Sequence, residues 1–272
     1  MKLNKLMFRE YDIRGIWNED ITEEISYYIG RAYATKLLSL KKNKMIVGYD
    51  NRLSSPIIEK NLVKGLTDGG VDVVRLGLVT TPMYYYAWDK LNIHCGIMIT
   101  ASHNPKEYNG FKMSYNGIHN CFGNEVAELY YIILNGIYSK GNGSITDANI
   151  KEDYIKMINS HINMGSNKLK VIYDCGNGTT SIVAKDIFVS NDNIEYIPLF
   201  AESDGTFPNH HPDPAVESNL TILKEKVKEL NADCGIAFDG DGDRIGVVME
   251  NGELMPIEFL MLLYIKDMFN NV

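Results

Sequence analysis

Three aspartates occupy alternate positions in the segment 239–244, and glycine occupies both positions between them. Glycine lets the backbone curl tightly, so that the carboxylates of Asp239, Asp241 and Asp243 can converge. Three converging anions repel one another unless a cation lies among them. Because all the donor atoms are oxygens, the segment predicts a site for Mg²⁺ or Ca²⁺ rather than for zinc.

The same spacing fits an EF-hand calcium loop, in which Glu250 would be the twelfth residue. The sixth position of such a loop needs glycine for its sharp turn, and here it is Arg244. The flanking segments are also typical of strands rather than helices. The EF-hand is therefore excluded. A solvent-exposed acidic turn is the remaining alternative, and the regular spacing of the aspartates makes it the weaker one.

Ser102 lies in a second polar segment, 100–105, directly after an apolar run. It could be a nucleophile with His103 or Lys112 as its base. The G-x-S-x-G turn of a serine hydrolase is absent, and a lone serine–histidine pair more often only satisfies backbone groups. If both polar segments line one cleft, a phosphate on Ser102 would suit the cation of the aspartate segment. Ser102 would then carry a phosphoryl group.

Two other polar segments, 176–181 and 207–214, give weaker signals. The first follows a strand as a dinucleotide-binding turn does. Ser181 stands where the third glycine is needed, so a tight turn at a helix start is predicted instead. The second contains His210 and His211, which could be metal ligands. Neighbouring histidines on an irregular loop rarely converge on one ion, and the sequence offers no third ligand.

Apolar strands alternate with helices along the chain, which predicts an α/β fold with parallel crossovers. The Gly-, Asn- and Ser-rich segment 140–147 predicts a linker between two halves. Strands are predicted at 45–49, 71–76, 95–100, 111–115, 169–174, 194–199, 233–238 and 245–250. Helices are predicted at 22–40, 55–68, 82–91, 123–135, 149–161, 179–189 and 216–230.

The two halves also repeat one another, which predicts a duplicated α/β unit. In both halves a Cys-Gly-Ile strand leads directly into one of the two polar segments that carry Ser102 and the aspartates. Open α/β sheets bind ligands beyond the carboxyl ends of their strands, so both segments are expected to face one cleft. The matching segments, in the same order, are 47–50 with 171–174, 72–74 with 195–197, and 95–97 with 234–236.

The composition is that of a globular protein with 272 residues, of which 45% are hydrophobic and 23% charged. This length predicts about two domains and excludes a disordered or collagen-like chain. The net charge of −8 and the lack of a basic patch argue against nucleic acid as a partner. No apolar run spans a bilayer and the N-terminus lacks a signal-peptide core, so a cytoplasmic protein is expected. Four cysteines without a CxxC pair predict buried thiols.

Six short segments together resemble the α-D-phosphohexomutase family, in its phosphomannomutase/phosphoglucomutase branch. They are FREYDIRGI at 8–16, TASHNP at 100–105, YNGFKM at 108–113, DCGNGT at 174–179, FPNHHPDP at 207–214 and DGDGDR at 239–244. The resemblance implies two repeated three-layer α/β/α domains with mixed or parallel sheets. It implies domain I with the phosphoserine loop at 1–140, domain II with the metal loop at 148–252, and the start of a truncated domain III at 253–272.

The resemblance implies catalytic roles for four residues of the first half. Ser102 is expected to carry the phosphoryl group, and His103 is expected to support its loop. Lys112 is expected to be the general acid or base, with Arg14 as its partner.

The resemblance also implies ligand-binding roles. The metal ligands for Mg²⁺ would be Ser102 through its phosphate, Asp239, Asp241 and Asp243. The residues that bind the substrate or its phosphate would be Arg244, Asn104 and Tyr11.

The reaction that the resemblance implies moves phosphate between the 1- and 6-positions of mannose or glucose. Phosphoserine gives its phosphoryl group to a hexose phosphate, and the resulting 1,6-bisphosphate returns its other phosphoryl group to the serine. Glucose or mannose 1,6-bisphosphate is the expected activator. Hexose phosphates are the expected partners, with no nucleic acid and no membrane.

The chain departs from the family after Met255, where an amphipathic helix is predicted. The sugar-recognition loop of the third domain and the phosphate-binding loop of the fourth domain do not occur in the sequence. A truncated mutase of low activity is therefore expected, with a terminal helix that is displaced, packs elsewhere or drives association. The alternative is a non-catalytic phosphosugar- or metal-binding protein derived from the family.

Overall fold

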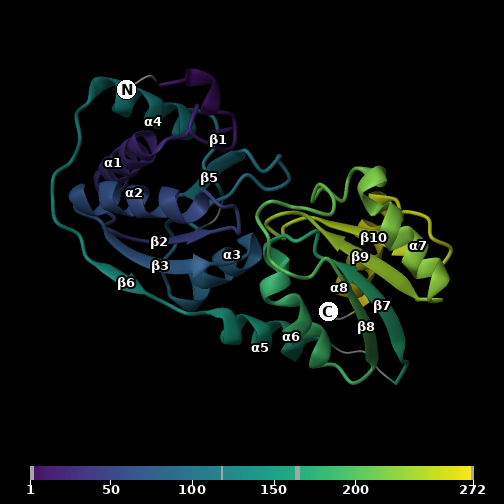
Figure 1. Cartoon of the computed structure of the whole chain (residues 1–272). Coiled ribbons are helices and arrows are strands. Elements are labelled where there is room, and N and C mark those ends of the chain that lie inside the picture. Colours follow the sequence, from purple (N-terminus) through teal and green to yellow (C-terminus); the bar gives the residue numbers. More distant parts are fainter. Residues whose placement is uncertain (1–2, 118, 163–165, 271–272) are drawn as a thin grey trace. The chain divides into compact units, whose positions relative to one another are not determined.

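The computed structural model describes residues 3–117, 119–162 and 166–270. The chain divides into two compact units, Met1–Tyr154 and Ile155–Val272 (Figure 1). Helix α5, Lys151–His161, includes the boundary between them. Among the described residues, no helix is long and apolar enough to cross a membrane. All four cysteines are free thiols and only Cys234 is partly exposed, which agrees with the prediction from their spacing.

A six-stranded mixed sheet forms the centre of unit 1, in the order β1-β5-β4-β2-β3-β6. Strands β4, β2, β3 and β6 are parallel, whereas β5 is antiparallel to both β4 and β1. The strands are β1 Ile13–Ile16, β2 Lys44–Tyr49, β3 Asp72–Leu78, β4 Gly96–Ile99, β5 Tyr108–Ser114 and β6 Ile145–Asp147.

Helices cover both faces of the unit 1 sheet. Helices α1, α2 and α4 pack on the face that carries Met45 and Val47. Helix α3 packs on the opposite face, where Tyr84 lies close to Ile46 beside Gly96. Side chains alternate between faces along a strand, so β2 is buried on both sides. The helices are α1 Glu23–Ser39, α2 Ser55–Asp68, α3 Thr81–Lys90 and α4 Asn124–Asn135.

A smaller mixed sheet forms the centre of unit 2, in the order β10-β9-β7-β8. Strand β7 is parallel to β8 and β9, and β10 is antiparallel to β9. Helix α7 packs on the face of Ile172, and α6 packs on the face of Tyr173. The elements are β7 Leu169–Asp174, α6 Ala184–Val189, β8 Ile194–Leu199, α7 Thr221–Glu229, β9 Cys234–Phe238, β10 Ile245–Met249 and α8 Ile257–Asn270.

The predicted α/β class and the predicted repeat are both confirmed. The order β5-β4-β2-β3 of unit 1 corresponds to β10-β9-β7-β8 of unit 2, with the same parallel and antiparallel pairings. The matched segments of the sequence fall on equivalent strands: β2 with β7, β3 with β8, and β4 with β9. In both units the polar loop therefore follows the equivalent strand, which is β4 in unit 1 and β9 in unit 2.

Two local predictions need correction. The predicted helix 179–189 is a 3-10 turn, Thr179–Ile182, followed by the short α6, because Thr179 hydrogen-bonds to the carbonyl of Gly240 instead. The segment 140–147 contains β6, which extends the sheet of unit 1. Arg75 donates two hydrogen bonds to Asp147, and the backbone and side chain of Ser144 both donate to Asp72.

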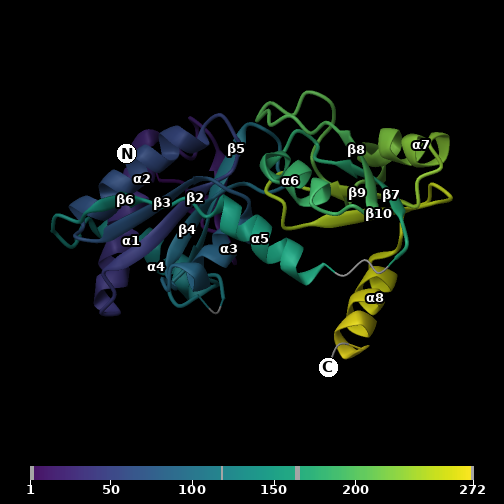
Figure 2. The same ribbon diagram turned by 90° about the horizontal axis from the view of Figure 1, so that it is seen from below.

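Helix α8 is the last described helix of the chain (Figure 2). Its large apolar side chains lie around its circumference, and most of them are exposed. Phe259 and Phe269 are 61% and 78% exposed, whereas Leu260 is buried. A contiguous apolar surface of this kind is typical of a contact face.

The crossing of α1 and α2 depends on two glycines. A Cβ atom at Gly65 would lie 2.1 Å from the carbonyl oxygen of Tyr27, and one at Gly30 would lie 2.3 Å from that of Leu62. Helix backbones can approach this closely only where no side chain intervenes.

We predict that Gly65→Ala destabilises unit 1 by about 1–3 kcal/mol, because the added methyl group forces the helices apart. Helix propensity alone would give the opposite sign, a gain of about 1 kcal/mol. Urea denaturation measures the difference. Lys64→Ala, on the exposed side of the same helix, is the control and should change the free energy of unfolding by less than about 0.5 kcal/mol. A stabilised Gly65→Ala variant would contradict the close crossing.

Candidate functional site

The loop after β4 carries Ser102 in an unusual backbone conformation. Ser102 has a φ of 51°, in the left-handed region that non-glycine residues rarely adopt. Its amide donates to Oγ1 of Thr100 at 2.8 Å. A residue held in this region costs on the order of 1–3 kcal/mol, so the surrounding contacts must fix it.

Arg52 provides those contacts, and the sequence analysis did not identify it. Its side chain is fully buried, and its Nε donates to Oδ2 of Asp50 at 3.1 Å. The guanidinium donates to four backbone carbonyl oxygens of the serine loop: Ser102 at 2.9 Å, Asn104 at 2.7 Å, Pro105 at 2.6 Å and Tyr108 at 3.1 Å. The buried guanidinium of Arg52 therefore binds four carbonyl oxygens within residues 102–108.

Asp50 anchors this arrangement at the carboxyl end of β2. Its Oδ1 accepts from the amide of Arg52 at 3.1 Å and from Oγ of Ser55 at 2.6 Å. Asn109 donates to Oγ of Ser54 at 2.8 Å and to Oγ of Ser55 at 3.0 Å. Ser54 is the N-cap of α2 but makes no side-chain capping bond, and its hydroxyl accepts a hydrogen bond from Asn109 instead.

Arg14 reaches the serine loop from β1. Its Nη1 donates to the carbonyl of Ala101 at 3.1 Å and to Oδ1 of Asn104 at 2.5 Å. Its Nη2 donates to Asp12 at 2.6 Å, and the pair is largely buried. Arg14 is therefore in direct contact with Asn104 of the serine loop.

Lys112 lies on β5, next to β1. Arg14 is paired with Gly110 across these strands. Side chains two residues apart share a face of a strand, so Lys112 projects from the same face as Arg14. The opposite face carries Ile13 and Phe111 of the core.

His103 lies beside Ser102, whereas Tyr11 is an exposed residue of the N-terminal segment. His103 Nδ1 lies 3.4 Å from Oγ of Ser102. Tyr11 is 69% exposed in the segment before β1. Arg14, Ser102, His103 and Asn104 are thus brought together at one loop.

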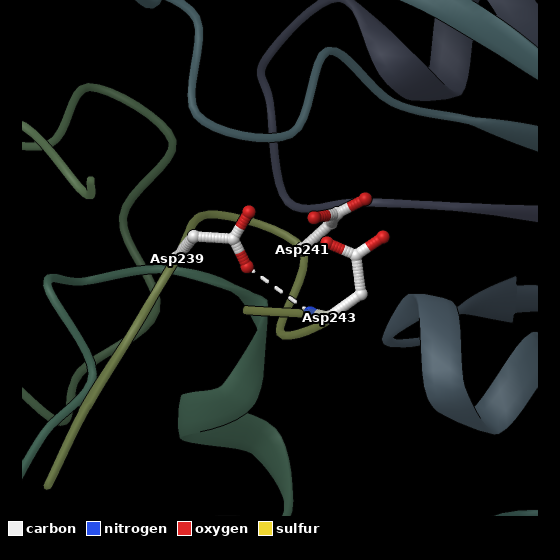
Figure 3. Close-up of side chains that lie close together, drawn as sticks. All are labelled: Asp239, Asp241 and Asp243. Atoms are coloured by element: carbon white, nitrogen blue, oxygen red, sulfur yellow. Dashed lines mark hydrogen bonds between the residues drawn. The ribbon is translucent and has the colours of Figure 1, made fainter. Parts of the chain in front are cut away.

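The aspartate loop joins β9 to β10 in unit 2 (Figure 3). Asp239 Oδ1 accepts from the amides of Gly242 at 3.1 Å, Asp243 at 3.0 Å and Arg244 at 3.0 Å. These bonds curl the loop around the first carboxylate, as the glycines predict. Asp239 and Asp241 are buried, whereas Asp243 is exposed.

The three carboxylates converge as predicted. One oxygen from each of Asp239, Asp241 and Asp243 lies within 4.8 Å of the others. An all-oxygen donor set of this size fits Mg²⁺, which typically binds a few carboxylates and keeps its other positions for water or phosphate. The strands on either side of the loop confirm that it is not an EF-hand.

The turn after β7 supports the aspartate loop through contacts with Gly240. The amide and Oγ1 of Thr179 both donate to the carbonyl of Gly240 at 2.9 Å. A Cβ atom at Gly178 would lie 3.0 Å from the same oxygen, so the two backbones touch. The glycine-rich segment 176–181 is therefore a support for the aspartate loop, and it is not part of a longer helix.

Arg244 follows the aspartates and is exposed. With Asp243 it lies at one end of a cavity of about 910 Å³ in unit 2, whose other walls include Val247, Leu254 and Leu260.

Comparisons with known proteins identify the family. The description "Phosphoglucomutase/phosphomannomutase, alpha/beta/alpha domain I" matches residues 5–135, and the corresponding domain II matches residues 152–252. The chain belongs to the phosphoglucomutase/phosphomannomutase family. The resemblance inferred from the six short segments is thereby confirmed.

Individual relatives agree with this assignment. The phosphomannomutase/phosphoglucomutase of Pseudomonas syringae is 44% identical over 96% of this chain and 56% of its own length. The phosphoglucomutase of Neisseria meningitidis is 39% identical over 97% of this chain and 57% of its own. A crystal structure of a Burkholderia thailandensis family protein has a TM-score of 0.94 and 34% identity over 99% of this chain and 60% of its own. The chain spans a little over half the length of these relatives.

We predict that Arg52→Met destabilises unit 1 by about 3–5 kcal/mol, because it leaves the carboxylate of Asp50 buried without its cation. Arg75→Met is the matched control. It also removes an arginine–aspartate pair, but an exposed one, and should cost less than about 1 kcal/mol. Urea denaturation measures both variants. Equal losses would show that the pair with Asp50 has no special role.

We predict that Asp241→Asn weakens Mn²⁺ binding by roughly tenfold or more, since one of three converging carboxylates is lost. Electron paramagnetic resonance of free Mn²⁺ measures the affinity. Glu250→Gln is the control, because an EF-hand would use this glutamate and the arrangement seen here does not. Unchanged binding by Asp241→Asn would contradict the assignment of the cation site.

Proposed function

We propose that this chain provides the phosphoserine and metal loops of a phosphohexomutase that interconverts hexose 1-phosphates and hexose 6-phosphates. The observation that carries the proposal is the serine loop, which two arginines hold through its carbonyl and amide oxygens, with Lys112 on the adjoining strand face. The names of the relatives support mannose and glucose phosphates as substrates.

In the proposed reaction, a hydroxyl oxygen of the hexose phosphate attacks the phosphorus of phosphorylated Ser102. The bond between phosphorus and Oγ breaks, which leaves a hexose 1,6-bisphosphate and the serine hydroxyl. Ser102 Oγ then attacks the other phosphate of the bisphosphate and regenerates the phosphoserine. Lys112 takes the proton from the attacking hydroxyl and returns one to the leaving oxygen.

Charge neutralisation is the main demand of phosphoryl transfer. Arg14 and Lys112 supply positive charge beside Ser102, and His103 and Asn104 shape the loop around it. Asp239, Asp241 and Asp243 would hold Mg²⁺, together with the phosphate of Ser102, and the ion would supply further positive charge to the phosphoryl oxygens. Arg244 and Tyr11 would bind the substrate and its phosphate.

The proposal extends to the longer protein that the relatives suggest. Residues 1–140 and 148–252 would form domains I and II, and residues 253–272 would begin a third domain. The remaining sugar contacts would come from that further part of the protein, so the 272-residue chain alone would have low mutase activity. Glucose or mannose 1,6-bisphosphate would be the activator, because it loads Ser102.

We predict that glucose or mannose 1,6-bisphosphate phosphorylates Ser102 in the 272-residue chain when Mg²⁺ is present. Intact-mass spectrometry and peptide sequencing detect the added phosphoryl group. Lys112→Ala should slow the loading by about 10²–10⁴-fold, as expected for loss of a general acid or base. Lys106→Ala, an exposed lysine of the same loop, is the matched control and should load normally.

The Ser102→Ala variant should accept no phosphoryl group. Failure of the unmodified chain to load on either bisphosphate would favour the alternative, a non-catalytic phosphosugar- or metal-binding protein. Loading at another residue in both chains would contradict the role of Ser102.

A further inference from the structure

His210 lies in the loop 207–214, and each nitrogen of its ring faces an acceptor. Nδ1 lies 2.9 Å from the carbonyl oxygen of His211. Nε2 lies 3.1 Å from each carboxylate oxygen of Asp174. A carbonyl oxygen cannot donate a hydrogen bond, and neither can an ionised carboxylate. Both ring nitrogens can donate to these acceptors only when each carries a proton, so this geometry favours the imidazolium form of His210.

The ion pair with Asp174 is well shielded from water. Asp174 ends β7 and its side chain is 1% exposed, and that of His210 is 14% exposed. The Phe200 ring, whose centroid lies 5.2 Å away, and the backbone of Gly176 also pack on the imidazole. Burial alone would lower the pKa of His210, but the hydrogen bond and negative charge of Asp174 outweigh it and raise this pKa above its ordinary value.

The pair fixes a turn that the backbone alone would not favour. Gly176 and Asn177 have φ values of 51° and 56°, both in the left-handed region. Asp174 Oδ1 accepts from the amide of Gly176 at 2.8 Å. Asn209, next to His210, donates to Oδ1 of Asn177 at 2.8 Å. The loop 207–214 therefore contacts the turn 174–179 through two side chains, those of Asn209 and His210.

The far side of this turn is in contact with the aspartate loop. Thr179 donates twice to the carbonyl of Gly240, which lies between Asp239 and Asp241. At its other end, the loop 207–214 packs Pro214 against Gly246, where a Cβ atom would lie 3.0 Å away. The turn 174–179 thus contacts the aspartate loop itself, and the loop 207–214 contacts the strand that follows it. The His210–Asp174 pair joins these two supporting segments.

We propose that His210 is a positioning residue for the cation site: its imidazolium, paired with Asp174, holds the turn 174–179 against Gly240, and cation binding at Asp239, Asp241 and Asp243 weakens when His210 loses its proton. The proposal rests on the metal site of the proposed function. It assigns a role to His210 that is distinct from metal ligation.

The direction of the pH dependence follows from the raised pKa of His210. The unfolded chain titrates near 6.5 and the folded chain at a higher value. The pair therefore contributes its full stabilisation below about pH 6.5, and this is lost as the pH rises through the folded pKa. Titration of the carboxylate ligands would have the opposite sign, because deprotonation of a ligand strengthens metal binding, so it cannot produce a loss of affinity as the pH rises.

The first arm of the test uses the unmodified 272-residue chain. Nitrogen-15 NMR of the imidazole rings distinguishes an imidazolium from either neutral tautomer. The His210 signal is assigned as the one that is missing in His210→Asn. If that variant does not fold, each of the other five histidines is replaced singly, and the signal that persists in all five variants is that of His210. We expect both His210 nitrogens to be protonated at about pH 7. A neutral ring with one protonated nitrogen at this pH would overturn the proposal.

The second arm measures Mn²⁺ affinity by electron paramagnetic resonance from about pH 6 to about pH 8.5, the range in which a raised histidine titrates. In the unmodified chain, affinity should fall by about three- to tenfold with rising pH, a modest loss for a residue that acts through its neighbours. The midpoint should coincide with that of the His210 NMR signal. His210→Asn should bind weakly at every pH.

His211→Asn is the matched control, since it replaces the neighbouring histidine and leaves the backbone carbonyl in place. It should reproduce the unmodified pH profile. A flat profile in the unmodified chain, or tight and pH-independent binding by His210→Asn, would overturn the coupling alone. Absence of Mn²⁺ binding by the unmodified chain would overturn the cation site, and the coupling with it, while the NMR result would still decide the charge of His210.

Discussion

A buried aspartate at the carboxyl end of the central strand organises each unit of this protein. In unit 1, Asp50 follows β2 and pairs with Arg52. In unit 2, Asp174 follows β7 and pairs with His210. Both aspartates also accept the amide of the residue two positions further along, at 3.1 Å and 2.8 Å respectively. The duplicated fold thus repeats the same device, with a different cation in each copy.

These buried pairs supply partners for the polar backbone groups that the loops bury. A loop at the end of a buried strand turns its carbonyl oxygens inward, and a buried polar group without a partner is costly. A guanidinium can satisfy several such oxygens at once, as Arg52 does for residues 102–108. The buried cation needs its own counterion, which the aspartate supplies. The result is a serine held at a φ of 51° and an aspartate loop supported through Gly240.

The sequence predicts the fold class, the repeat and the convergence of the three aspartates, because these depend on local periodicity and spacing. It does not predict the contact of Arg52 with the carbonyl of Ser102 or that of His210 with Asp174, because these partners lie 50 and 36 positions away and are selected only when the chain folds. Residue type also misleads where a side chain has two possible uses. Ser54 stands at a helix start yet bonds to Asn109, and Thr179 leaves the predicted helix to bond to Gly240.

The most direct test of this account is amide hydrogen exchange in Asp50→Asn and Asp174→Asn, read by mass spectrometry on the folded chain. Loss of one aspartate should accelerate exchange in the loop that it organises: residues 100–108 for Asp50→Asn, and residues 174–179 and 239–244 for Asp174→Asn. The strands and the loops of the other unit should exchange as before. Loops that keep their protection in both variants, while exchange rises evenly along the chain, would contradict the claim that these buried pairs hold the functional loops.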